Sequence, residues 1–226
     1  MSTGTSAAAT PVAGVAIARR VQVVAPRLLV SGQVVLREVA VEVHAGEAIG
    51  VTGPNGAGKS TLLRALAGLD GEPSVRWDLD LDSADKAIDG VVLVGHDPGL
   101  HPHLTLAENL RLAAALRTGS TLPVATALER VGLAGAAGRL AGQCSAGMLR
   151  RAGLARAWAS RPALLLLDEP TAGLDAASRG LPAALVRSTA AAGGMVVVAT
   201  HEPAAFDDVV DRWLHVGGGR VTSRQP

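Results

Sequence analysis

The sequence predicts an α/β fold with a mostly parallel sheet, an antiparallel β subdomain and an inserted α-helical subdomain. Three observations lead to this fold class: short continuous apolar runs, stretches in which apolar and polar residues alternate, and helix-like segments between several of the runs. Continuous apolar runs are typical of parallel strands buried on both faces, whereas alternation is typical of antiparallel strands with one wet face. The length of 226 residues allows one domain with a subdomain.

Two segments show the alternating pattern. In 37–43 (REVAVEV) three valines alternate with other residues, and in 74–82 (SVRWDLDLD) Val, Trp and Leu alternate with Arg and Asp. We expect both segments to lie in an antiparallel sheet with one face toward solvent.

The continuous apolar runs are 48–52 (AIGVT), 91–94 (VVLV), 164–167 (LLLL) and 195–200 (MVVVAT). We expect these runs to form parallel strands that are buried on both faces.

Helical signals lie between the runs. Leu62, Leu66 and Leu69 share one helical face after a glycine-rich segment, and 125–133 and 145–160 also read as helices. The region from about 97 to 160 shows no clear buried strand. We therefore expect it to be a helical subdomain inserted into the sheet domain.

Composition narrows the possible functions. A net charge of +1 and 2% aromatic residues disfavour a nucleic acid as partner. The single cysteine, Cys144, excludes an internal disulfide framework and fits a reducing compartment. No window reaches eighteen uninterrupted apolar residues, so we expect no membrane span, and any action at a membrane requires a partner.

The N-terminal segment 1–18 has neither a charged start nor a strong Leu-rich core. We therefore predict a disordered leader rather than a signal peptide, followed by a single domain over 19–226.

Each apolar run is followed at once by a polar segment: GPNGAGKST, GHDPG, DEPTAGLD and HEP, in chain order. Ligands of open α/β sheets bind outside the carboxyl ends of the strands. We expect the four segments to converge on one crevice.

The segment 53–61 (GPNGAGKST) matches the phosphate-binding pattern G-x-x-x-x-G-K-[ST] between a strand and a helix. Its glycines let backbone N–H groups cradle phosphate oxygens at a helix N-terminus. We expect Lys59 to reach the β and γ phosphates, Ser60 to bind Mg²⁺ through its hydroxyl, and Thr61 to add a phosphate contact. A glycine-rich turn that merely contains lysine is the alternative. The predicted nucleotide-binding residues of this loop are Gly53, Pro54, Asn55, Gly56, Ala57, Gly58, Lys59, Ser60 and Thr61.

Asp168 and Glu169 form a carboxylate pair at the end of the LLLL run. We expect Asp168 to hold Mg²⁺, directly or through water, and Glu169 to orient and polarise an attacking water. A capping Asp-Glu pair before a proline turn is the alternative. Read with the phosphate loop, the pair predicts a P-loop core that binds phosphate and Mg²⁺, which the resemblance described next identifies as a P-loop ATPase core.

The order GPNGAGKST, CSAGM, LLLLDEPTAGLD and a lone histidine after VVVAT resembles the nucleotide-binding domain of ABC (ATP-binding cassette) ATPases, over about 19–221. The resemblance implies ATP hydrolysis with Mg²⁺, in which Lys59, Glu169 and His201 are catalytic. It implies two partners: a second ABC ATPase subunit, identical or different, and an integral membrane permease. The chain would then be cytoplasmic and peripheral on the inner face of the cell membrane.

The segment 144–148 (CSAGM) matches the family's signature, usually written LSGGQ, at Ser145 and Gly147. By that resemblance both residues would cap the γ-phosphate of ATP held by the other subunit. The other interpretation, which can hold at the same time, is that Ser145 is an ordinary helix N-cap.

Two further roles follow from the resemblance. Asp175, in TAGLD, matches the loop that touches the facing subunit; a simple turn with a helix N-cap at Asp175 is the alternative. His201 matches the switch histidine, which would hydrogen-bond the γ-phosphate and help fix the water near Glu169.

The stretch 94–110 matches the family's link between sheet core and helical subdomain, expected to move with the γ-phosphate and to lie near the membrane partner. The family normally has Gln where His96 stands. His96 would contact a metal-bound water or ligate Mg²⁺ poorly, and in a register one residue later Asp97 would be the ligand. His96 after a glycine, and Arg150–Arg151 after SAG, also resemble the ATPase subunit of the cytochrome c maturation heme exporter.

The family usually stacks adenine on an aromatic residue in the first strand region, but residues 21–38 contain none. We expect Leu28, Leu29 or Val30 to form an apolar wall instead.

Three functions compete at this point. The first is an ATP-hydrolysing subunit that powers a membrane transporter by ATP-driven dimer closure. The second is a soluble ABC-type ATPase that acts in assembly or regulation without a membrane partner. The third is a nucleotide-binding regulator that does not hydrolyse, against which Glu169 and His201 argue.

Overall fold

Two sheets organise the chain in the computed structural model, which describes residues 18–69, 76–81, 90–116 and 123–224. Of the expected leader over 1–18, only Ala18 is among the described residues, where it opens the first strand. The described strands are β1 (Ala18–Val30), β2 (Gln33–His44), β3 (Ala48–Thr52), β4 (Arg76–Leu81), β5 (Val91–Val94), β6 (Leu164–Asp168), β7 (Met195–Ala199), β8 (Arg212–Gly217) and β9 (Arg220–Arg224).

The smaller sheet has the strand order β2-β1-β4 and is antiparallel throughout. Both alternating segments lie in it: 37–43 belongs to β2, and 76–81, the described part of 74–82, is β4. In β2 the valines 39, 41 and 43 are buried, while Ala40 is exposed. The prediction of an antiparallel sheet with one wet face is confirmed for β2.

The larger sheet has the order β5-β6-β7-β3-β8-β9. Its first five strands are parallel to one another, and only β9 is antiparallel, to β8. All four continuous apolar runs are strands of this sheet, so the predicted α/β fold with a mostly parallel sheet is confirmed.

Each face of the larger sheet covers a separate core. On β6, Leu164 and Leu166 face α1 (Lys59–Leu66) and the antiparallel sheet, whereas Leu165 and Leu167 face the remaining helices. The same alternation of period two continues on β7. Because both faces are buried, nearly every position of these strands must be apolar, which explains the continuous runs.

The prediction that all four runs are buried on both faces is wrong for β5. Val92 and Val94 are buried, but Val91 and Leu93 are only partly buried. The reason is position, because β5 is the edge strand of the sheet and has a neighbour on one side only.

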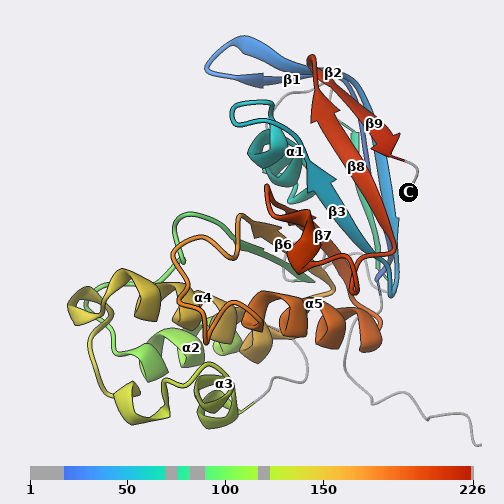
Figure 1. The fold of residues 1–226 in the computed structure, drawn as a ribbon. Coiled ribbons are helices and arrows are strands. Elements are labelled where there is room, and N and C mark those ends of the chain that lie inside the picture. The colour runs from blue at the N-terminus through green and yellow to red at the C-terminus, as the bar shows by residue number, and fades with distance from the viewer. Residues whose placement is uncertain (1–17, 70–75, 82–89, 117–122, 225–226) are drawn as a thin grey trace, which may run out of the picture.

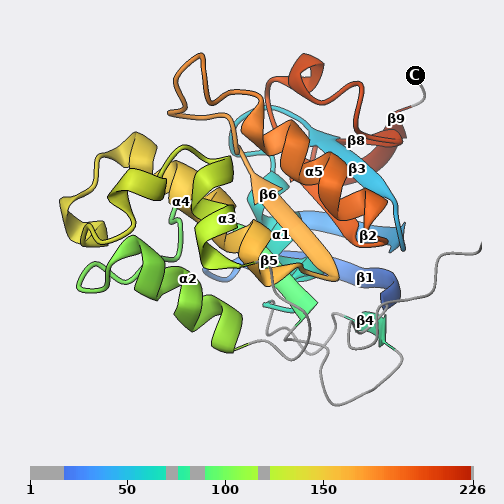
Figure 2. The ribbon, with the colours of Figure 1, turned by 90° about the horizontal axis from the view of Figure 1, so that it is seen from below.

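The helices cover the larger sheet on the face opposite α1 (Figures 1 and 2). They are α2 (Leu106–Ala115), α3 (Val124–Arg130), α4 (Ala146–Ser160) and α5 (Leu181–Ala191). The first three lie in the region between β5 and β6 that we expected to be helical. One detail of the predicted first helix is wrong: Leu69 lies beyond the end of α1 and is 55% exposed, because the helix stops at Leu66 and Gly68 turns the chain with φ 70°.

Thr105 begins α2 with a capping box. Its hydroxyl accepts from the Glu108 backbone N–H at 3.2 Å, and the Glu108 carboxylate accepts from the Thr105 N–H at 2.8 Å. These bonds satisfy N–H groups that have no partner inside the helix. We expect Thr105→Ala to lower the free energy of unfolding by about 1 kcal/mol at neutral pH, measured by urea denaturation.

The same pair adds a pH dependence. Backbone and side-chain hydrogen bonds from Thr105 lower the pKa of Glu108. Because the pKa of Glu108 is lowered in the folded state, its charged carboxylate stabilises the fold at pH values above the ordinary glutamate pKa. This stabilisation is lost as the pH falls through the lower pKa of the folded state. The difference in the free energy of unfolding between wild type and Thr105→Ala should therefore become smaller at acidic pH. Thr105→Ser is the control that keeps the hydroxyl, which lies 2.8 Å from the Glu108 carboxylate and is the bond to that carboxylate that alanine loses. A constant difference at all pH values would mean that this hydroxyl bond does not stabilise the charged form of Glu108.

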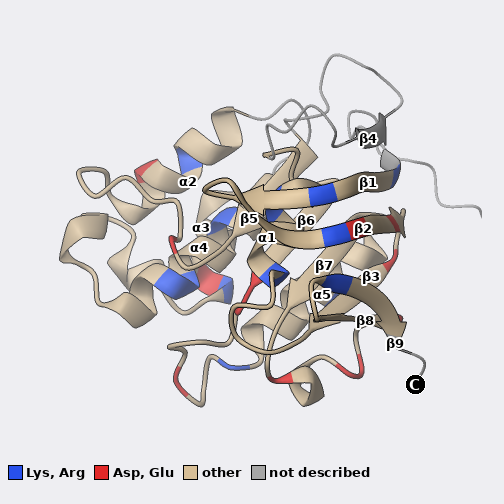
Figure 3. Ribbon diagram, turned by 90° about the horizontal axis from the view of Figure 1, so that it is seen from above, with Lys and Arg blue, Asp and Glu red and all other residues tan. Residues whose placement is uncertain are grey.

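Charges are mixed over the described part of the chain. Figure 3 shows basic and acidic residues interspersed along the ribbon rather than gathered on one element. Among the described residues, no helix has the length and apolar character that crossing a membrane requires.

Candidate functional site

The carboxyl ends of three neighbouring strands build the site. β3 leads into the glycine-rich loop, β6 ends at Asp168, and β7 ends just before Thr200. Cross-strand hydrogen bonds tie these ends together: the Glu169 N–H donates to the Ala199 carbonyl at 2.8 Å and the Thr200 N–H to Val51 at 3.0 Å. Sequence segments more than a hundred residues apart therefore meet at one edge.

Gly53 lets the phosphate loop leave β3 next to β8. Its φ is 150°, and a Cβ at this position would lie 2.1 Å from the Val216 carbonyl oxygen. Any side chain would therefore force the loop away from the sheet. After this turn Pro54, Asn55 and Gly56 are exposed, and Ala57 and Gly58 are half-buried.

Lys59 is the first residue of α1 and is only 6% exposed. Its ammonium donates to the carbonyl oxygens of Gly53 at 2.9 Å and Pro54 at 3.3 Å, and lies 3.6 Å from Glu169 Oε1. The lysine thus closes the loop on itself and joins it to β6. Ser60 is exposed and Thr61 half-buried in the same first turn, where helix N–H groups have no internal partner.

Glu169 bridges the phosphate loop and His201. Its second oxygen, Oε2, lies 2.6 Å from His201 Nδ1 and accepts from the His201 backbone N–H at 3.2 Å. Because a carboxylate only accepts, Nδ1 carries the hydrogen in this contact. The structure therefore brings together the three residues that we predicted to be catalytic: Lys59, Glu169 and His201.

The backbone of Glu169 is in the left-handed region, with φ 48°. A residue with a Cβ seldom adopts this conformation, which costs of order 1–3 kcal/mol and is common at functional sites. The Glu169 carbonyl accepts from the Ala172 N–H at 3.1 Å, and the turn aims the carboxylate at Lys59 and His201 rather than along β6.

Asp168 and Ser60 offer oxygen donors at this edge. Asp168 is half-buried at the end of β6, and Ser60 is exposed on the first turn of α1. A carboxylate and a hydroxyl suit Mg²⁺, which binds few protein oxygens and retains water and phosphate ligands. The described residues contain no cluster of three or more His, Cys, Asp or Glu able to hold a metal by itself.

The signature residues lie at the start of α4. Ser145 is its N-cap and accepts from the Met148 N–H at 3.3 Å. Ser145 is exposed, and a Cβ on Gly147 would lie 3.7 Å from the Gly173 carbonyl. Among the described residues, neither forms a hydrogen bond to the phosphate loop of its own chain. Burial raises the pKa of the neighbouring Cys144 thiol, which makes it a poor nucleophile.

Asp175 is exposed and closes a turn. Hydrogen bonds from the Ser178 side chain and backbone, with a smaller effect of Arg151, lower the pKa of Asp175. The Ser178 N–H lies 2.9 Å from Oδ1. Asp175 is not the N-cap of α5, which is Gly180; of the alternatives for Asp175, the turn is present and the helix N-cap is absent.

His96 lies in the loop after β5 and contacts α4. Its Nδ1 is 3.1 Å from an Arg150 nitrogen, and the neighbouring Asp97 accepts from the Gly99 N–H at 2.8 Å. On α4, Arg150 binds the Gly95 carbonyl of this loop, and Arg156 binds the Pro98 carbonyl of the loop and the Leu93 carbonyl of β5. These three hydrogen bonds did not follow from the sequence, although the Arg150–Arg151 pair was visible in it.

The expected apolar wall for the base is only partly available. Leu28 is fully buried, so it cannot face a ligand, whereas Leu29 is half-buried and Val30 is 49% exposed. Val35 is a further neighbour of the loop, because its Cγ1 would lie 2.8 Å from a Cβ on Gly58. Of the described aromatic residues, Phe206 and Trp158 are buried, and Trp213 of β8 covers Gly50 of β3.

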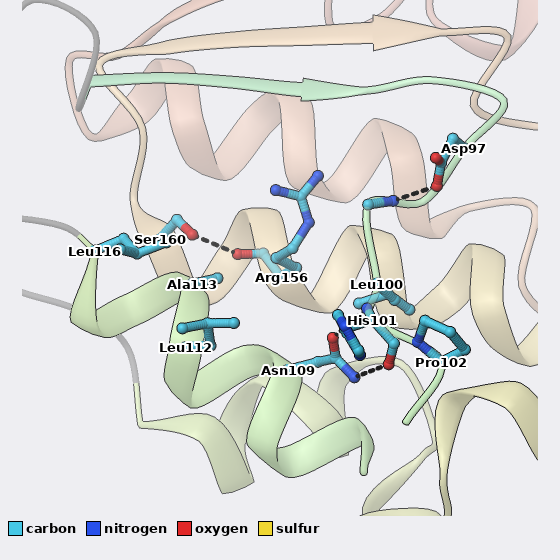
Figure 4. A pocket seen from close by; sticks show the side chains of 11 residues that line it. Asp97, Leu100, His101, Pro102, Asn109, Leu112, Ala113, Leu116, Arg156 and Ser160 are labelled. Carbon is cyan, nitrogen blue, oxygen red and sulfur yellow. Dashed lines mark hydrogen bonds between the residues drawn. The ribbon is translucent and has the colours of Figure 1, made fainter. Parts of the chain in front are cut away.

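A pocket of about 550 Å³ lies apart from the phosphate loop, between the 95–102 loop, α2 and α4 (Figure 4). Leu112 and Leu116, which line it, are 47% and 69% exposed. The other lining residues are Asp97, Gly99, Leu100, His101, Pro102, Asn109, Ala113, Arg156 and Ser160.

A glycine-rich loop joins a strand to a helix at the carboxyl end of a parallel sheet, next to a buried lysine, an acidic pair and a histidine. This arrangement defines a P-loop nucleoside triphosphatase. Residues 36–172, more than half of the chain, match the family described as ABC transporter.

Curated relatives and a solved structure agree with this match. The chain is 43% identical over 190 residues to the thiamine import ATP-binding protein ThiQ of Cereibacter sphaeroides, covering 80% of this chain and 82% of that protein. It is 36% identical over 192 residues to the cytochrome c biogenesis ATP-binding export protein CcmA of Vibrio cholerae, covering 82% and 92%. A solved ATP-binding subunit of an ABC transporter superposes with a TM-score of 0.81 at 25% identity, covering 91% of this chain and 89% of that one.

The chain therefore belongs to the ABC transporter family, as one of its ATPase subunits.

Proposed function

We propose that this chain powers a membrane transporter through ATP-driven closure of a dimer, as a cytoplasmic subunit held at the inner face of the cell membrane by a permease. The observation that best supports hydrolysis is the contact of Lys59 and His201 with the same carboxylate, that of Glu169. One residue of each kind that phosphoryl transfer needs is thus placed at one edge: a phosphate-binding cation, a carboxylate for the water, and a histidine.

In this proposal the phosphate loop, 53–61, binds the triphosphate through its N–H groups. Lys59 turns from the Gly53 and Pro54 carbonyls to the β and γ phosphates, which frees the carboxylate of Glu169 to polarise the attacking water. His201, released from Glu169, then donates a hydrogen bond to the γ-phosphate. Mg²⁺, held by Ser60 and Asp168, would neutralise phosphate charge.

The proposed dimer is supported by the position of the signature residues. Ser145 and Gly147 are at the start of α4 and have no hydrogen bond to their own phosphate loop among the described residues. An exposed helix N-terminus is a site for an anion, so we place these residues on the γ-phosphate of ATP in a facing subunit. Asp175, in an exposed turn, would contact that subunit.

A permease contact is supported by the pocket beside the 95–102 loop. Two exposed leucines, Leu112 and Leu116, line it on α2. Exposed apolar side chains grouped around a hollow favour contact with another protein segment. We propose no cargo, because one of the relatives is named for import and the other for export.

The proposal is tested by tagging the full chain in its own source cells, solubilising their membranes in detergent and purifying through the tag. A stoichiometric integral membrane subunit is the expected result, together with Mg²⁺-dependent ATP hydrolysis. Hydrolysis without any membrane subunit would favour the soluble assembly or regulatory ATPase instead. Nucleotide binding without turnover would favour the regulator that does not hydrolyse.

A further inference from the structure

Helix α4 binds three carbonyl groups, one in β5 and two in the loop that follows it. Arg156 donates to Leu93 at 3.0 Å and Pro98 at 3.2 Å, and Arg150 donates to Gly95 at 3.0 Å. Arg156 is deep enough that burial lowers its pKa. The loop is therefore fixed on both sides of His96.

A glycine allows this close approach. Gly153 of α4 is buried, and a Cβ on it would lie 3.2 Å from the Pro98 Cβ. The loop thus packs directly on the helix backbone between Arg150 and Arg156. His96 is held by this arrangement although its own side chain is exposed.

The hydrogen bond between Arg150 and His96 can have only one direction, with Arg150 as the donor. A guanidinium nitrogen donates and cannot accept, so the His96 Nδ1, 3.1 Å away, must offer a lone pair. A neutral imidazole that accepts at Nδ1 carries its hydrogen on Nε2. Both ring nitrogens are then committed: one lone pair to Arg150 and the other nitrogen to its hydrogen.

We infer that Arg150 is a positioning residue that holds His96 in the tautomer protonated on Nε2, so that His96 is a hydrogen-bond donor and not a metal ligand. Metal ligation by imidazole needs a free lone pair, and this arrangement leaves none. Between the two roles considered for His96, hydrogen bonding to an oxygen is therefore favoured over ligation of Mg²⁺.

The acceptor follows from the position of the loop. β5 is the parallel neighbour of β6, with Val94 paired to Leu167, so His96 follows the strand end beside Asp168. An Nε2–H donor there suits an oxygen acceptor: a phosphate oxygen of ATP or a water bound next to it. This step rests on the proposed function, whereas the tautomer does not.

The tautomer is tested by NMR on the full chain with ¹⁵N-labelled histidine, without nucleotide, at about pH 8.5, where unperturbed histidines are neutral. We expect His96, assigned from the His96→Gln spectrum, to be a single tautomer with an unprotonated Nδ1. Arg150→Ala should give a mixture of both tautomers, whereas the matched control Arg151→Ala, whose arginine binds the Val131 carbonyl instead, should leave the His96 signals unchanged. Coincident His96 signals in wild type and Arg150→Ala would overturn the inference.

Metal ligation by His96 is tested in a second experiment that does not use Arg150→Ala. Mn²⁺ replaces Mg²⁺ with ATP, and electron–nuclear spectroscopy of the frozen ¹⁵N-histidine protein detects nitrogen bound directly to the metal. We expect no such ¹⁵N coupling from His96. A coupling that disappears in His96→Gln would overturn the inference, whereas one that persists belongs to another histidine and supports it. If Mn²⁺ and ATP fail to bind at all, the proposed function fails, while the NMR experiment still decides the tautomer.

Discussion

Replacing Glu169 by glutamine is expected to reduce ATP hydrolysis by about 10²–10⁴-fold while ATP binding persists. That range is the usual contribution of a general base and corresponds to about 2.7–5.5 kcal/mol of barrier. Glutamine keeps the size of the side chain and its carbonyl oxygen, so it can still accept from His201. It lacks the basicity that polarises the water and the charge opposite Lys59, 3.6 Å away. Steady-state turnover and calorimetric ATP affinity give the two readouts.

Glu202→Gln is a matched control for this experiment. Glu202 lies in the same segment, with its carboxylate 3.7 Å from His201 Nε2, but it does not contact Lys59 in the described structure. We expect near-normal turnover in Glu202→Gln. Near-normal turnover in Glu169→Gln would remove Glu169 from the catalytic role, and equal losses in both variants would indicate a general effect of charge near His201.

The larger sheet could be predicted because burial on both faces leaves a local trace in the sequence. Four continuous apolar runs marked four parallel strands. β8 left no such trace, because it carries Arg212 and His215 and only two of its side chains are buried. The glycines 217–219 at its end are a hairpin signal that would have revealed β8 and β9.

The partial exposure of β5 could not be predicted, since the order of strands in a sheet is set by contacts between distant segments. VVLV and LLLL look alike in sequence, yet one is the edge strand and the other lies inside the sheet. The end of α1 is different, because the sequence carries a local signal for it. Leu69 continues the helical spacing of Leu62 and Leu66, but Gly68, a residue typical of helix ends, turns the chain before it.

The candidate site could be predicted in its residue types because each polar segment directly follows a strand, and parallel strands end at the same edge. The pairing of particular atoms could not. Lys59 and Glu169 are 110 positions apart, and His96 and Arg150 are 54 apart on different elements. The left-handed backbone of Glu169 is likewise a tertiary effect, since its sequence neighbours carry no glycine signal.

Replacing Lys59 by alanine is expected to weaken ATP binding by about 10²-fold. Hydrogen bonds to charged groups contribute about 1.5–3 kcal/mol each, and 2.7 kcal/mol corresponds to about a hundredfold change in Kd. The ammonium must first leave the Gly53 and Pro54 carbonyls and the Glu169 carboxylate, so the gain on binding phosphate is a difference between two sets of contacts. The loss is therefore smaller than the full strength of the phosphate contacts.

Arg64→Ala separates the specific effect of Lys59 from a general loss of positive charge. Arg64 is a cation on the same helix, exposed in its last turn, away from the loop. Calorimetry should show ATP affinity close to wild type for Arg64→Ala and much weaker affinity for Lys59→Ala, both measured below the unfolding temperature of each variant. Equal affinities of Lys59→Ala and wild type would mean that the triphosphate does not reach this lysine, and the assignment of 53–61 as the phosphate loop would fail with it.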